Sequence, residues 1–124
     1  MNTLTQPQSD TLWHTIRRET EQACADEPTL ASFLHLTVLR HQSFERVLAF
    51  HLSSKLASPI MDARALYEIY LSALRSDEGI AAAALADIVA YYERDAACDA
   101  YSLPLLYYKG HHAIQAHRIN HWLW

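Results

Sequence analysis

Two aspartates, four residues apart, carry the clearest chemical signal in the sequence. Asp95 and Asp99 lie in the stretch YYERDAACDAYS, at a predicted helix end. The C-terminus of a helix favours cations, so carboxylates placed there are mildly unfavourable and invite a functional explanation, such as holding an ammonium group. Two structural explanations compete with this one, because Asp95 could cap the next turn or pair with Arg94. The four-residue spacing alone does not decide between the functional explanation and the two structural ones.

Histidines crowd the stretch KGHHAIQAHRINHWLW, which holds four of the eight in the sequence. His117 and His121 are four residues apart and would share a helix face, as the histidine pairs of zinc enzymes do. Two ligands do not make a site, and Asn120 stands where a catalytic glutamate would be expected, so we predict no metal. His111-His112 could suggest a proton shuttle, but nothing nearby supplies a nucleophile. We expect ordinary polar or packing roles for His14, His35, His41 and His51.

Asp87 is a charged residue on an apolar stripe. It falls on the same predicted helix face as Ile80, Ala84, Ile88 and Tyr91. A carboxylate among apolar neighbours is costly unless it has a partner. Either Asp87 is paired at an interface, or that helix face is more exposed to solvent than its apolar residues suggest.

The elements that must position these side chains are helices. The sequence holds only two glycines, whereas a sheet protein of this length would use many in turns and bulges. The stretch IAAAALADIVAYYE also has high intrinsic helix propensity. We predict an all-α fold, a compact bundle of about six to eight helices. Apolar residues recur at the helical spacing of three and four, in the sets Leu12 and Ile16; Leu30, Phe33, Leu34 and Val38; Phe44, Val47, Leu48 and Leu52; Leu66, Ile69, Tyr70 and Leu74.

Capping residues predict where two of the helices begin. Asp10 and Asp62 each precede an apolar stripe, and a carboxylate there can accept hydrogen bonds from the free N–H groups of the first turn. No repeat or linker interrupts the chain that follows. We therefore expect a flexible N-terminus over residues 1–11 and one helical domain over residues 12–124.

Two breaks divide the second half of the chain. Ser76-Asp77-Glu78-Gly79 predicts a turn before the alanine-rich helix. Ser102-Leu103-Pro104 then predicts a break that starts a final pair of helices, with a hinge between them at Gly110. These breaks place Asp95 and Asp99 between the alanine-rich helix and the final pair.

Composition argues against several kinds of partner. The formal net charge of -4 gives no electrostatic footprint for nucleic acid. No apolar run approaches the ~20 residues that span a bilayer, and the N-terminus lacks the basic start and apolar stretch of a secretory signal, so we expect a cytoplasmic protein. Cys24 and Cys98 form no Cys-x-x-Cys pair, and we expect both to be reduced.

The last third of the chain is rich in amphipathic aromatic residues. Core packing is the default interpretation, but Tyr and Trp are also enriched at subunit interfaces. A membrane anchor is disfavoured, because His-Trp-Leu-Trp is too short to insert and no basic amphipathic face precedes it. The residues concerned are Tyr91, Tyr92, Tyr101, Tyr107, Tyr108, Trp122 and Trp124.

Longer segments resemble a known family. The stretches EPTLASFLH, KLASPIMDARAL and YYERDAACDAYSLPLLYYKGHHAIQAHRINHWLW, with the alanine-rich helix before the last of them, are similar to the N-terminal helical domain of bacterial serine O-acetyltransferase. The likeness runs from about Leu12 to Trp124. The last stretch is the most specific, because it matches the family pattern R-D-x-A-x-D-x-Y-S-x-P-L-L-Y-x-K-G-x-H-A-x-Q-A-x-R-I-x-H-W-L-W almost throughout.

The resemblance implies an activity for the full-length enzyme. The family transfers an acetyl group from acetyl-coenzyme A to L-serine, the first step of cysteine biosynthesis, and a histidine in a left-handed β-helix acts as general base. That β-helix is not found in this sequence, which looks cut off at its end. We therefore expect the chain to hold no catalytic residue and no cofactor, and to be inactive alone.

The resemblance also assigns roles and partners. Asp95 matches the family aspartate that can hold the ammonium group of serine, and Asp99 is a weaker candidate for the same pocket. In the family this domain joins two trimers into a hexamer, and inhibitory L-cysteine occupies the serine position. O-acetylserine sulfhydrylase binds a C-terminal tail that is absent here. The alternative interpretation is a freestanding helical oligomerisation module without catalysis.

Overall fold

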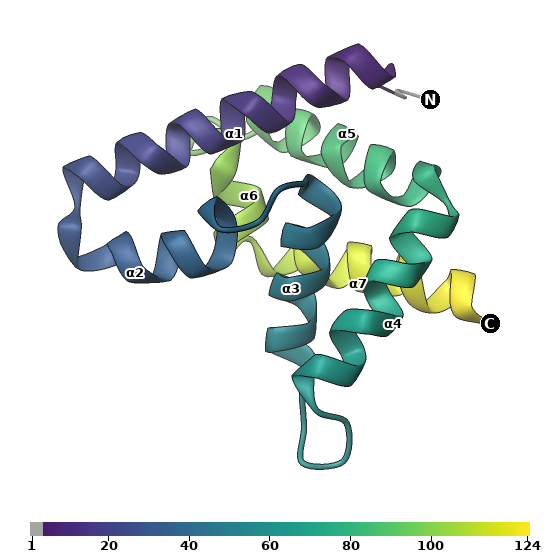
Figure 1. The fold of residues 1–124 in the computed structure, drawn as a ribbon. Helices are drawn as coiled ribbons and strands as arrows, with labels where there is room; N and C mark the ends of the chain where they lie inside the picture. Colours follow the sequence, from purple (N-terminus) through teal and green to yellow (C-terminus); the bar gives the residue numbers. More distant parts are fainter. Residues whose placement is uncertain (1–3) are drawn as a thin grey trace.

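Residues 4–124 of the computed structural model form seven α-helices and no β-strand (Figure 1). The predicted all-α class, with six to eight helices, is confirmed. No helix in this range has the length and hydrophobicity needed to cross a membrane. In chain order the helices are α1 (Gln6–Asp26), α2 (Ala31–Leu34), α3 (Phe44–Leu56), α4 (Ala63–Ser76), α5 (Glu78–Arg94), α6 (Ser102–Tyr107) and α7 (Lys109–Leu123), with a short 3-10 turn η1 (Pro28–Leu30) before α2 and a π-helical turn η2 (His35–Leu39) after it.

Helix α1 begins before the residue predicted to cap it. The Thr5 hydroxyl accepts a hydrogen bond from the Gln8 N–H at 3.2 Å, and the Gln8 side chain accepts one from the Thr5 N–H at 2.8 Å. This capping box satisfies two free N–H groups at once. Asp10 instead lies inside the helix, so the prediction that it is the cap is wrong. Residues 1–3 lie outside the described residues, and the predicted division at residue 11 stays a prediction.

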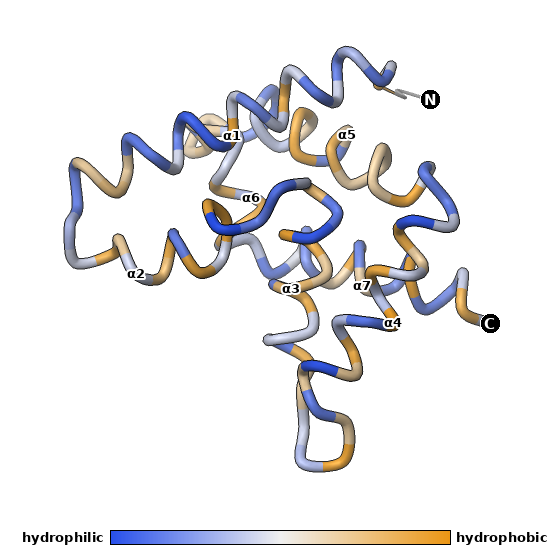
Figure 2. Tube along the Cα trace, in the orientation of Figure 1, coloured by the Kyte–Doolittle hydropathy of each residue, from blue (hydrophilic) through white to orange (hydrophobic). Residues whose placement is uncertain are grey.

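The core lies where α3 and α4, which pack side by side, meet α1, α5 and α7 (Figure 1). Figure 2 shows α5 as largely hydrophobic along its length, whereas much of α1 is hydrophilic. Three members of the predicted stripes are exposed, because Leu30 and Phe33 are each 40% exposed and Ile69 is 37% exposed. A fourth, Leu66, is half-buried against the core. The stripe members that are buried include Leu12, Ile16, Leu34, Val38, Phe44, Val47, Leu48, Leu52, Tyr70 and Leu74.

A single residue joins α4 to α5. The N–H of Asp77 donates to the carbonyl of Ala73 at 3.1 Å, and its carboxylate accepts from the N–H of Gly79 at 2.9 Å. Asp77 therefore ends one helix and caps the next, and the predicted four-residue turn is reduced to one residue. Asp62 caps α4 as predicted, accepting from the N–H of Ala65 at 2.8 Å.

The junction between α6 and α7 lies at Tyr108, whose backbone is extended, and not at Gly110. Gly110 is already in the first turn of α7, so the predicted hinge there is wrong. A Cβ atom added at Gly110 would lie 3.2 Å from the hydroxyl oxygen of Tyr91. The glycine thus allows α7 to approach α5 closely.

Candidate functional site

Asp95 ends α5 with an exposed carboxylate that is held in one orientation. Its N–H donates to the carbonyl of Tyr91 at 3.0 Å, and its backbone then turns into an extended conformation. Oδ1 accepts from the N–H of Ala97 at 2.9 Å. Oδ2 accepts no hydrogen bond from residues 4–124 and keeps its full capacity for a ligand. Of the two structural explanations for Asp95, capping of the next turn is right, and no ion pair with Arg94 forms within these residues.

Asp95 lines an open pocket of about 380 Å³ between α5 and α7. Arg94 lines the same pocket, so a carboxylate and a guanidinium from adjacent residues are both available there. This pair complements the ammonium and carboxylate groups of a free amino acid, since both contacts would be charge-assisted hydrogen bonds. The other lining residues are Asp87, Ala90, Tyr91 and Ile114.

Asp99 is exposed on the segment between α5 and α6 and does not line this pocket. Asp99 and Asp95 are related only by the effect of their charges on the pKa of Tyr108. The pKa of Tyr108 is raised to about 12, first by a hydrogen bond with the Cys98 side chain, then by desolvation, and further by the charges of Cys98, Asp95 and Asp99. Both carboxylates therefore contribute negative potential at this tyrosine, which favours a bound cation.

Glu19 of α1 fixes the far end of the segment that carries both aspartates. Its two carboxylate oxygens accept from the N–H of Tyr101 at 3.1 Å and of Ser102 at 2.8 Å. These bonds satisfy free N–H groups where α6 begins, because Tyr101 itself offers no capping side-chain bond. Sequence reasoning missed Glu19. The only available signal was a predicted helix start that lacked a local cap.

Asp87 is paired at an internal interface, between α5 and α7. Arg118 forms an ion pair with its carboxylate, and the Gln115 side chain donates to the same oxygen at 2.8 Å. Of the two interpretations drawn from the sequence, pairing is therefore right. Arg118 therefore neutralises Asp87, whereas Asp95 is the carboxylate in the pocket that has no cationic partner within residues 4–124.

His111 and His112 are buried, which is at odds with a proton shuttle that exchanges with solvent. Nε2 of His111 lies 3.2 Å from the carbonyl oxygen of Ala84, and Nε2 of His112 lies 2.6 Å from that of Leu105. A carbonyl can only accept, so each Nε2 carries a proton. Each Nδ1 is buried without a hydrogen-bond partner within residues 4–124, and burial lowers the pKa of both side chains, so each imidazole is neutral at pH 7. We conclude that these side chains connect α7 to α5 and α6.

His51 joins this pair and is not an isolated packing residue as expected. Its ring lies 4.8 Å from that of His112 between centroids, and its Nε2 lies 3.1 Å from the carbonyl oxygen of Leu106. Burial, more than any other cause, lowers the pKa of His51 and of His111 to about 4. A cluster of three neutral imidazoles, His51, His111 and His112, therefore lies inside the domain.

His117 and His121 share an exposed face of α7, as predicted from their spacing. Their ring centroids are 6.4 Å apart. Within residues 4–124 no group of three or more His, Cys, Asp or Glu side chains is arranged to hold a metal ion. The shared face therefore offers two imidazoles without a third ligand.

Comparisons with known proteins converge on one family. The family model for the N-terminal region of serine acetyltransferase matches residues 12–116. The serine acetyltransferase of Salmonella typhimurium is 48% identical over 113 residues, which is 91% of this chain and 41% of that protein. The chain thus spans less than half the length of this relative.

Solved structures agree with the sequence comparison. The Neisseria gonorrhoeae serine acetyltransferase in complex with serine matches with a TM-score of 0.87 and 70% identity, over 90% of this chain and 46% of that one. A serine acetyltransferase in complex with cysteine matches with a TM-score of 0.89 and 46% identity, over 92% of this chain and 47% of that one.

Proposed function

The chain belongs to the serine acetyltransferase family as its N-terminal domain, and from this premise we propose that it serves an enzyme that transfers an acetyl group from acetyl-coenzyme A to the hydroxyl group of L-serine. In this proposal Asp95 binds the ammonium group of serine, and Asp99 adds negative potential nearby. The observation that carries the proposal is the unused Oδ2 of Asp95 in an open pocket, in a chain similar to an enzyme solved with serine.

Asp95 would select for an amino acid and would not carry out the acetyl transfer. The transfer requires a general base for the serine hydroxyl proton. No histidine lines the Asp95 pocket, and the pKa of nearby His111 is lowered by burial to about 4. We therefore assign the base to another part of the enzyme. L-Cysteine carries the same ammonium group and would inhibit by binding the same carboxylate.

Self-association is the second proposed role of this domain. It is supported by apolar side chains that are exposed in residues 4–124, among them Ile60 at 96% and Trp124 at 102% exposure. Cytoplasmic location is supported by Cys24 and Cys98, which are both free. The proposed engagement of O-acetylserine sulfhydrylase rests on the family resemblance alone.

The proposed function can be tested in a chimeric enzyme in which this chain replaces the matching part of the Neisseria gonorrhoeae enzyme. Asp95→Asn should raise the KM for L-serine by about 10- to 100-fold, because a hydrogen bond to a charged group contributes about 1.5–3 kcal/mol. The KM for acetyl-coenzyme A should not change. Asp10→Asn, an exposed change on α1, is the matched control.

Two results would contradict this proposal in different ways. An unchanged KM for L-serine in the Asp95→Asn chimera would remove the role of Asp95 in serine binding. A chimera that folds and assembles but has no acetyltransferase activity would favour the freestanding oligomerisation module instead.

A further inference from the structure

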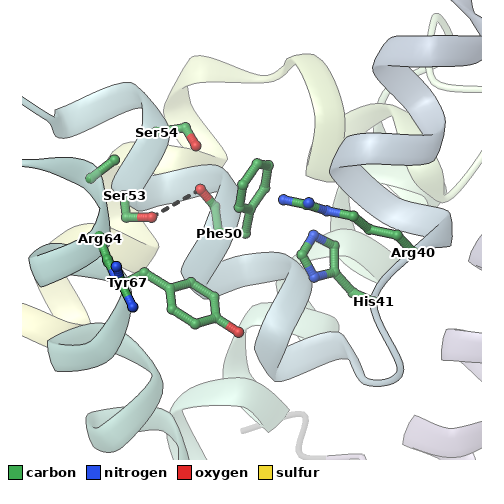
Figure 3. Close-up of a pocket in the computed structure, with 8 residues that line it drawn as sticks. Arg40, His41, Phe50, Ser53, Ser54, Arg64 and Tyr67 are labelled. Atoms are coloured by element: carbon green, nitrogen blue, oxygen red, sulfur yellow. Dashed lines mark hydrogen bonds between the residues drawn. The ribbon is translucent and has the colours of Figure 1, made fainter.

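A second pocket, of about 490 Å³, lies where the end of η2 meets α3 and the start of α4 (Figure 3). It shares no residue with the Asp95 pocket. In Figure 3, Arg40 reaches in from one side and Arg64 lies on the other, with Phe50 and Tyr67 between them. The complete lining is Arg40, His41, Phe50, Ser53, Ser54, Ala63, Arg64 and Tyr67.

Neither arginine of this pocket has a carboxylate partner among residues 4–124. The only ion pair within residues 4–124 joins Arg118 to Asp87, far from this lining in sequence. Arg40 is anchored through Nε, which donates to the carbonyl of Leu36 at 3.0 Å, and its remaining N–H groups donate to no residue in this range. The nearest acidic residue in sequence to Arg64 is Asp62, whose Oδ1 already caps α4. Positive charge in the pocket is therefore not neutralised.

The surroundings make the pocket more favourable for an anion. Arg64 lies in the first turn of α4, where the helix dipole is positive and a cation is unfavourable unless an anion is close. Burial lowers the pKa of His41, and the charges of Arg40 and Arg46 lower it further. The dipole of α4 and the lowered pKa of His41 both indicate a positive electrostatic potential inside the pocket.

The pocket also offers a flat apolar surface. Phe50 is half-buried, and its ring lies 4.6 Å from Cζ of Arg40 and 4.9 Å from the ring of His41 between centroids. The hydroxyl groups of Ser54 and Tyr67 make no hydrogen bond within residues 4–124 and remain available at the rim. The lining thus combines cationic groups, two free hydroxyls and an aromatic surface.

We propose that this pocket binds a small organic anion, in which a phosphate or carboxylate group is carried on a flat apolar body. The anionic group lies between Arg40 and Arg64. Arg40 can donate from its two Nη groups while Nε keeps its bond to Leu36, and the exposed side chain of Arg64 can turn towards the anion. The apolar body lies against Phe50. Guanidinium groups suit both kinds of anion, because they donate pairs of N–H bonds to two oxygens.

The test is a titration of the 124-residue chain with phenyl phosphate, followed by NMR of the arginine side-chain N–H groups and backbone amides. We expect saturable binding in the low millimolar range, with shifts confined to the pocket lining. Inorganic phosphate and phenol each supply one half of the ligand and should bind at least ten-fold more weakly. Benzoate, in a parallel titration, distinguishes a carboxylate ligand from a phosphate ligand.

A matched pair of variants locates the site. Arg64→Gln should weaken phenyl phosphate binding about ten-fold, while Arg75→Gln, at the other end of α4 and outside the pocket, should not change it. Circular dichroism at 222 nm shows that both variants keep their helices. The proposal is overturned if both variants weaken binding equally, if phenol binds as tightly as phenyl phosphate, or if no titration saturates.

Discussion

Arg118 of α7 forms an ion pair with Asp87 of α5, and it also donates to the side chain of Gln115, which bonds to the same carboxylate. The three side chains form a closed polar network between the two helices, in addition to the contact of His111 with the carbonyl of Ala84. Asp87 and Arg118 are partly exposed, with side-chain exposures of 28% and 33%. Solvent therefore screens the ion pair but does not remove it.

The first prediction concerns this network. Asp87→Ala should lower the free energy of unfolding by about 1–2 kcal/mol, because two hydrogen bonds to a charged group are lost and solvent compensates in part. Urea unfolding monitored by circular dichroism measures the loss. The Asp87→Ala, Arg118→Ala double variant should lose less than the sum of the single variants. Strict additivity would mean that the two residues do not stabilise each other.

The second prediction is a dependence of stability on pH between about 4 and 6.5. Burial lowers the pKa of His51 and His111 from 6.5 to about 4, so the unfolded chain binds more protons than the folded chain in this window. Stability is therefore fully present above pH 6.5 and falls as the pH is lowered. The expected loss is about 2 kcal/mol per histidine between pH 7 and pH 5.

Charged residues around the histidine cluster change the size of this pH dependence of stability but not its sign. Asp87 raises the pKa of His111 and Arg118 lowers it, while Lys55 lowers that of His51. Urea midpoints at pH 7 and pH 5 measure the dependence. His111→Gln should reduce it by about half, because His51 still contributes, whereas His14→Gln, an exposed change on α1, should leave it intact. Equal midpoints of the parent chain at both pH values would rule out buried neutral imidazoles.

The third prediction concerns Glu19. Glu19→Ala should cost about 2 kcal/mol, because the N–H groups of Tyr101 and Ser102 lose a charged acceptor. Faster amide hydrogen exchange at these two residues would locate the effect, and urea unfolding would measure its size. Glu19→Gln keeps one acceptor oxygen and should recover part of the loss. Glu21→Ala, exposed on the same helix, is the control, and an equal loss in this control would refute a specific role for Glu19.

The fourth prediction compares two aspartates that the sequence presents as equivalent helix caps. Asp62→Ala should cost about 1 kcal/mol, because it removes the bond to the N–H of Ala65. Asp10→Ala should change the free energy of unfolding by less than about 0.5 kcal/mol, because Asp10 bonds only to the side chain of Gln6 on the helix surface. Thermal unfolding of the two variants side by side measures the difference. Similar losses would contradict the observed cap at Thr5.

The comparison of Asp62 with Asp10 also shows what local sequence could predict. The helices and most of the core followed from apolar spacing, because a helix places residues three and four apart on one side. Asp10 failed as a cap because Thr5 and Gln8 together form a better one further upstream. Capping choices within one helix are close in energy, so a boundary is harder to predict than the helix itself.

Relationships across the fold could not be predicted from local patterns. Glu19 bonds to Ser102 across 83 positions, and His51 lies against the carbonyl of Leu106 across 55 positions. Neither residue has a periodicity or motif that indicates its partner. The orientation of Asp95 could have been predicted from the sequence, because an aspartate at a helix end commonly accepts a hydrogen bond from an N–H group two residues later. Its pocket depends on α7 and required the structure.

The single residue between α4 and α5 has a consequence for how this domain tolerates change in length. Asp77 ends α4 and caps α5, so no further residue lies between the two helices that could absorb a change in length. One inserted residue that extended either helix would rotate everything after it by about 100°. The buried face of α5 would then turn outwards, and Asp95 at its end would leave the pocket it shares with α7. We therefore expect the domain to tolerate an inserted residue in a loop, such as the one between α3 and α4, and not between α4 and α5.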